Sequence, residues 1–94
     1  MRFQWDFRKS HDNLFKHDVS FELAESVFLD PLNAIIESQF VDGEQRWVAI
    51  GLVPTGEVLY VVHTARESDD QITIRIISAR KASRRERRAY EEGY

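Results

Sequence analysis

The stretch from Asn33 to Ala79 constrains the fold more than any other part of the chain, because four strand-like segments follow one another there with only short turns between them. The segments are NAIIESQF, QRWVAIGLV, EVLYVVHTAR and TIRIISA, and the turns contain VDGE, PTGE and ESDDQ. Connections this short favour antiparallel neighbours. The alternation of residues such as Arg75 and Ile76 predicts a sheet with one packed face and one open face.

Helical signals flank these four strands. Asp6 and Ser20 are expected to cap two helices, and Ser83 with Glu86 forms a capping box that begins a third. These three helices are expected over about residues 8–17, over about residues 21–28 and after Ser83, and a short strand is expected at RFQW. The predicted fold class is therefore α+β, with an antiparallel sheet of about five strands, two N-terminal helices and one C-terminal helix, and with the helices on one sheet face.

Length and composition exclude several classes of protein. With 94 residues the chain is expected to form a single domain over residues 1–94, and the absence of cysteine excludes disulfides, thiolate zinc sites and thiol nucleophiles. The positions of His11, His17 and His63 match no metal motif, so we expect neither a metal ion nor a cofactor. No segment reads as a signal peptide or a membrane span, which favours a cytoplasmic bacterial protein.

The distribution of charge is more informative than the net charge of −3. The segment from Arg75 to Tyr90 holds seven basic residues and one acid, Glu86, so it carries +6 and leaves −9 on the rest of the chain. The basic residues of this segment are Arg75, Arg80, Lys81, Arg84, Arg85, Arg87 and Arg88. Guanidinium groups bind phosphate through paired donors, so nucleic acid is the natural partner. The alternative is a solvated helix that faces the acids of a partner protein.

Two arginines at strand ends are candidates for a shared phosphate site. Arg80 stands between the last strand and the last helix, and Arg66 ends the preceding strand, which we expect to pair with it. Arg75 and Arg80 are an odd number of residues apart, so a regular strand would not place both on one face. For Arg66 the alternative is a cross-strand ion pair with Glu67 or Asp70.

The first helix carries a polar stripe. Lys9, Asn13 and His17 recur every four residues, which brings a cation, an amide and a titratable imidazole onto one face. Leu14 and Phe15 are its apolar positions and are expected where the helix covers the sheet. His17 is a candidate proton carrier and Lys9 a candidate for phosphate binding. Exposed helix faces often look like this without any function.

Other chemical motifs are weak or absent. The aromatic residues, among them Trp5, Trp47, Tyr60 and the phenylalanines, are suited to stacking on bases, but a domain this small needs most of them in its core. The sequence has no glycine-rich phosphate loop, no ordering of serine, histidine and aspartate, and no close pair of carboxylates.

Four motifs together resemble one known family. They are WDFRKSHDNLFKHDVSFELAESVFLDP, GEQRWVAIG, VVHTARE and RIISARKASRRERRAY, which span nearly the whole chain. This pattern resembles the BrnT family of type II toxins. The resemblance implies a RelE-like ribonuclease that cleaves RNA without a metal ion, through attack of a ribose 2′-hydroxyl on the adjacent phosphate, and that inhibits translation and growth. It also implies a BrnA-like antitoxin partner with a ribbon-helix-helix DNA-binding segment, and contact with operator DNA only through that antitoxin.

The motifs also assign residues. By resemblance, Lys9, His17, Arg66 and Arg80 are expected to be catalytic. The residues expected to bind RNA or antitoxin are Asn13, Arg75, Lys81, Arg84, Arg85, Arg87, Arg88 and Tyr90. Phe7 departs from the pattern, since the family usually has proline after the WD pair. Two alternatives remain open: a non-catalytic binding module or degenerate toxin that acts only as antitoxin partner and co-repressor, and a structural partner whose basic helix pairs with an acidic protein surface.

Overall fold

The computed structural model describes residues 1–93 and confirms the α+β fold class. The elements are β1 (Arg2–Gln4), α1 (Phe7–His17), α2 (Phe21–Glu25), the short 3₁₀ helix η1 (Ser26–Leu29), β2 (Ala34–Val41), β3 (Glu44–Leu52), β4 (Val58–Ser68), β5 (Gln71–Lys81) and α3 (Arg84–Glu91). The predicted caps are present, because Asp6 and Ser20 accept hydrogen bonds from the first turns of α1 and α2, and Ser83 and Glu86 form the capping box of α3.

The five strands form one sheet in the order β1-β5-β4-β3-β2. Strands β2 to β5 are an antiparallel meander, as their short turns require. Strand β1 differs from the prediction of an antiparallel sheet, because it pairs in parallel with β5. Its partner is the last strand of the chain, so no short turn dictates the direction in which the two run.

One sheet face, here called the helical face, packs against α1, α2 and η1. Its core is formed by alternate strand residues, by apolar residues of α2 and η1, and by two residues of the connections between elements; these are Val19, Phe21, Ala24, Val27, Ala49, Val53, Leu59, Val61, Ile74, Ile76 and Ala79. Gly51 leaves room for η1, since an added Cβ would lie only 2.9 Å from Cγ1 of Val27.

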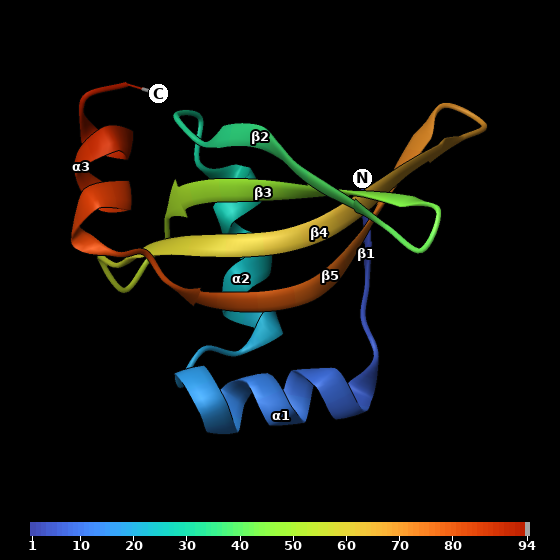
Figure 1. Cartoon of the computed structure of the whole chain (residues 1–94), viewed down its shortest axis with the longest axis horizontal. Helices are drawn as coiled ribbons and strands as arrows, with labels where there is room; N and C mark the ends of the chain where they lie inside the picture. Colours follow the sequence, from blue (N-terminus) through green and yellow to red (C-terminus); the bar gives the residue numbers. More distant parts are fainter. Residues whose placement is uncertain (94) are drawn as a thin grey trace.

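Helix α3 packs on the opposite face, where the sequence had predicted no helix. Tyr90 of α3 and Ala82 pack against a second, smaller cluster made by Val48, Ile50 and Val58. Figure 1 shows α3 at one end of the strands and the β4–β5 turn at the other. Helix α3 therefore covers only one end of this face, and the other end is open.

A β-bulge in β5 determines which residues share the open face. Val62 pairs with Ser78 but His63 pairs with Ile76, so Ile77 has no partner in the register. Side chains of paired residues point to the same face. The extra residue therefore places both Arg75 and Arg80 on the face opposite the helical one, although their spacing in a regular strand predicts opposite faces.

Helix α1 is anchored by a polar residue instead of an apolar one. Asn13 is only 5% exposed, and its side chain hydrogen bonds to the backbone of Val19 and Ala79. Leu14 and Phe15, predicted to lie against the sheet, are 47% and 90% exposed. The amide explains this difference, because it satisfies backbone groups on β5 that an apolar contact would leave unpaired.

Several phenylalanines also lie outside the predicted core. Phe7, Phe15 and Phe40 are exposed, whereas Phe3, Phe21 and Phe28 pack in the core on the helical face. His63 is buried there, edge-on to Phe28, and desolvation lowers its pKa. His63 is therefore a neutral core residue.

Candidate functional site

Arginines from four strands lie on the face opposite the helical one, here called the arginine face. The register and the alternation of side chains place Arg2, Arg46, Arg66, Arg75 and Arg80 on it. The Nε of Arg46 is buried and makes no hydrogen bond among the described residues. This face is therefore the basic surface of the sheet, and α3 covers it only near Arg80.

A polar hollow lies on this face where two hairpins separate. Pairing between β3 and β4 ends at Trp47 and His63, whereas β2–β3 pairing continues to Glu44 and β4–β5 pairing continues to Gln71. The two hairpin ends therefore diverge, as Figure 1 shows at the end away from α3. Between them is a hollow of about 320 Å³, lined by Gln4, Gly43, Glu44, Gln45, Trp47, Thr64, Ala65, Arg66, Thr73 and Arg75.

The two arginines of the hollow differ in their contacts. Nη2 of Arg75 donates a hydrogen bond of 2.5 Å to Oε1 of Glu44, which joins the two hairpins across the hollow. Arg66 is exposed, and its side chain makes no hydrogen bond or ion pair with the described part of the chain. The predicted alternative, an ion pair of Arg66 with Glu67 or Asp70, is therefore not formed. The guanidinium of Arg66 is available to bind an anion.

A second hollow adjoins the first at the β1 edge. Its volume is about 620 Å³, and it is lined by Phe3, Gln4, Trp5, Asp6 and Arg75. Gln4 and Arg75 line both hollows. The polar surface therefore continues from Arg66, past Arg75, to the beginning of α1.

Arg80 does not share a phosphate site with Arg66, in contrast to the expectation from sequence. Arg80 pairs with Tyr60, which is six residues from Arg66 on β4, so the two arginines are about 20 Å apart along the strand. The guanidinium of Arg80 is occupied by the carboxylate of Glu86, at 2.8 and 3.0 Å. The hydrogen bond to Glu86 raises the pKa of Arg80. These contacts connect β5 to α3.

The polar stripe predicted on α1 is interrupted. Asn13 is buried and its hydrogen-bonding groups bind the backbone, so it is not available to RNA or to a partner. Lys9 and His17 are both exposed, one turn before and one turn after Asn13. Along the helix they are about 12 Å apart. Lys9 lies in the part of α1 nearer to the second hollow, which begins at Asp6.

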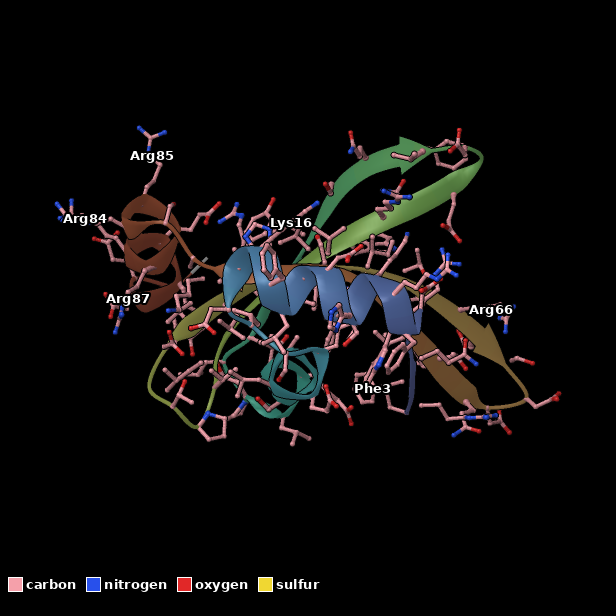
Figure 2. The ribbon with its side chains drawn as sticks, turned by 90° about the horizontal axis from the view of Figure 1, so that it is seen from below. Phe3, Lys16, Arg66, Arg84, Arg85 and Arg87 are labelled. Atoms are coloured by element: carbon pink, nitrogen blue, oxygen red, sulfur yellow. The ribbon has the colours of Figure 1, made fainter. Side chains whose placement is uncertain are left out.

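The residues after Arg80 that were expected to bind RNA or antitoxin divide into two groups. Lys81 forms an ion pair with Glu57 at 3.1 Å, and the Tyr90 hydroxyl donates to Asp30, so both have structural contacts. Arg84, Arg85, Arg87 and Arg88 are exposed on α3, where Arg87 forms an ion pair with Glu91 at 3.4 Å. Figure 2 shows that Arg84, Arg85 and Arg87 lie at the end of the molecule opposite Arg66. These helical arginines are therefore a surface separate from the hollow.

Sequence reasoning did not identify several residues of the hollow. Gln4, Glu44, Thr64 and Thr73 come from four different strands, and only the strand register brings them together. Thr64 and Arg66 are two residues apart on one strand, as are Thr73 and Arg75 on the next, and this spacing predicts that each pair lies on one polar face. Glu44 lies in the VDGE turn and in the motif GEQRWVAIG, but neither indicated a chemical role for it.

Comparison with known proteins links this geometry to a family. The sequence matches, over residues 5–86, the family model described as the ribonuclease toxin, BrnT, of type II toxin-antitoxin systems. The fold is similar to the crystal structure of the Brucella abortus ribonuclease toxin BrnT, with a TM-score of 0.69 and 27% sequence identity. That alignment covers 89% of this chain and 99% of the Brucella chain. No curated protein sequence matches the chain.

Proposed function

Because the chain belongs to the BrnT family of ribonuclease toxins of type II toxin-antitoxin systems, we propose that it cleaves RNA in the hollow beside Arg66, without a metal ion. In the proposed reaction the ribose 2′-hydroxyl attacks the adjacent phosphate, and arginines stabilise the charge that develops on the phosphate oxygens. The match agrees with the family expected from the sequence motifs. The resulting loss of RNA inhibits translation and arrests growth.

The observation that carries this proposal is the free guanidinium of Arg66 in a polar hollow. The side chain of Arg66 has no hydrogen-bond or ion-pair partner among residues 1–93, while Thr64, Thr73 and Gln4 supply further hydrogen-bonding groups around it. Arg75 lines the same hollow, but its charge is paired with that of Glu44. Arg66 is therefore the cation free to stabilise the negative charge that develops on the phosphate as the 2′-oxygen attacks.

The other residues expected to be catalytic have different proposed roles. We propose that Lys9 binds an RNA phosphate next to the second hollow, where the polar surface reaches α1. His17 is one helical turn beyond Asn13, and we propose that it carries a proton or positions α1. For Arg80 we propose an indirect role, in which its ion pair with Glu86 holds α3 on the sheet.

Type II families pair a toxin with an antitoxin, and we propose that a BrnA-like protein with a ribbon-helix-helix segment neutralises this chain. The exposed arginines of α3 are a proposed contact for it, and operator DNA would be bound through that antitoxin. No helix among residues 1–93 is long and apolar enough to cross a membrane.

The proposal is tested with purified protein and bulk RNA in the presence of a chelator. Wild-type protein is expected to cleave RNA, and Arg66→Ala is expected to lose about 100-fold in rate, the usual effect of removing one transition-state donor. Arg85→Ala is the matched control, because it removes an exposed arginine at the opposite end of the molecule. Binding of RNA without scission by the wild type would instead identify a non-catalytic binding module.

A further inference from the structure

The hollow beside Arg66 contains one carboxylate whose position suits it for proton transfer. Of the described residues that line the hollow, only Glu44 has a side chain that accepts a proton readily. The arginines remain protonated, and threonine and glutamine side chains are poor bases. Attack by a 2′-hydroxyl requires a group that removes its proton, so the hollow needs such a residue if it is the cleavage site.

The backbone fixes Glu44 in place. It is the first residue of β3 and pairs with Val41 across the β2–β3 turn. The two turn residues, Asp42 and Gly43, have φ values of 50° and 77°. A two-residue turn with positive φ at both positions matches the twist of its strands and sets their register. Glu44 is therefore held at the edge of the hollow by a tight turn.

One carboxylate oxygen is held and the other is free. Oε1 of Glu44 accepts the hydrogen bond from Arg75, whereas Oε2 makes no hydrogen bond or ion pair with the part of the chain that the structure describes. The side chain of Glu44 is 41% exposed. A carboxylate oriented through one oxygen and open at the other is suited to act as a general base.

We propose that Glu44 is the general base of the RNA cleavage, and that Arg75 positions it; this rests on the proposed function. The 2′-oxygen transfers its proton to Oε2 of Glu44 as the bond from the 2′-oxygen to phosphorus forms. The bond from phosphorus to the 5′-oxygen breaks, and that oxygen takes a proton from water. The hydroxide left behind accepts the proton from Glu44, so the carboxylate is restored. The products are a 2′,3′-cyclic phosphate and a 5′-hydroxyl.

The test compares Glu44→Gln with wild type in RNA cleavage and RNA binding. Glutamine keeps the size of the side chain and an oxygen that accepts from Arg75, so the hairpins stay joined. We expect kcat/KM to fall by about 100-fold or more, the dissociation constant for RNA to stay within a factor of about two, and the decline of the wild-type rate toward acid pH to disappear in the variant.

Glu57→Gln is the matched control, because Glu57 also pairs with a cation on the neighbouring strand, Lys81, but lies outside the hollow. Its activity is expected to equal that of wild type. A Glu44→Gln variant that cleaves RNA as fast as wild type would overturn the assignment of Glu44 and leave the proposed function intact. A wild-type protein without ribonuclease activity would overturn both.

Discussion

The guanidinium of Arg80 is held between an acid and an aromatic ring. Glu86 accepts two hydrogen bonds from it, at 2.8 and 3.0 Å, and its Cζ lies 3.8 Å from the centre of the Tyr60 ring. Three elements meet at this point, since Tyr60 is on β4, Arg80 on β5 and Glu86 on α3. Arg80 is therefore part of the contact that fixes α3, although the sequence indicated no ion-pair partner for it.

We expect Arg80→Ala to loosen α3. The change removes a two-point ion pair with Glu86 that is partly shielded from water, so the free energy of unfolding should fall by about 1 to 2 kcal/mol. Arg80→Lys should recover only part of the loss, because lysine does not form the paired contact. Urea unfolding and hydrogen exchange of the α3 amides measure this. Arg85→Ala, an exposed change on the same helix, should be neutral, and an equally stable Arg80→Ala would contradict the structural role.

The same ion pair predicts a dependence of stability on acid pH. The hydrogen bond from Arg80, together with those from Ser83, lowers the pKa of Glu86 from 4.5 to about 2 in the folded protein. Because the folded-state pKa is the lower one, this contribution to stability is present above pH 4.5 and is lost as the pH falls from 4.5 toward 2. Urea unfolding of Glu86→Gln should therefore show a lower stability at neutral pH and a smaller decline across this window. A decline as large as that of wild type would assign the acid sensitivity to other groups.

One such group is Asp30. Partial desolvation raises its pKa, but hydrogen bonds from Tyr90 and from the amides of Leu52 and Leu32 outweigh this effect, so the pKa is lowered overall. Tyr90→Phe removes the hydroxyl that joins α3 to Asp30. We expect the double variant Glu86→Gln with Tyr90→Phe to lose more of the acid dependence than Glu86→Gln alone. Equal pH profiles of the single and double variants would show that the hydrogen bond from Tyr90 to Asp30 contributes nothing to the acid dependence.

Asn13→Ala should be strongly destabilising. The side chain donates to the carbonyls of Val19 and Ala79 and accepts from the amide of Ala79, at 2.8 to 3.0 Å. Its removal leaves these buried groups without partners, which costs about 3 kcal/mol. Thermal unfolding tests this against Asp12→Ala, an exposed change on the same turn. A small effect of Asn13→Ala would mean that water replaces the amide.

Gly51→Ala tests the contact between β3 and η1. The added methyl would lie 2.9 Å from Cγ1 of Val27 and 3.1 Å from its carbonyl oxygen. Both distances are too short for a comfortable contact, so η1 must move, and we expect a loss of about 1 to 3 kcal/mol. The pair Gly51→Ala with Val27→Ala should show less than additive loss, because the second change removes the nearer of the two atoms. Additive losses would argue that the backbone contact dominates.

The sequence predicted the elements well and the contacts between distant residues poorly, for physical reasons. Caps at Asp6, Ser20 and Ser83 act within a few residues, so local patterns reveal them. The partner of Asn13 is Ala79, 66 residues away, and no periodicity within α1 marks that contact. The hollow exists because two hairpins diverge, which no single strand pattern encodes. Arg66 was found by its motif, whereas Glu44 became a candidate only through its place beside Arg75.

The bulge at Ile77 has a consequence for how the strand tolerates changes in length. Side chains along β5 point alternately to the two sheet faces. One residue more or fewer between Arg75 and Arg80 would therefore move every later side chain of the strand to the opposite face. Deletion of Ile77 would direct Arg80 toward the core on the helical face and would leave the cluster around Ile50 without Tyr90. Deletion of two residues would restore the alternation. The number of residues between Arg75 and Arg80 therefore determines which face of the sheet carries the basic side chains.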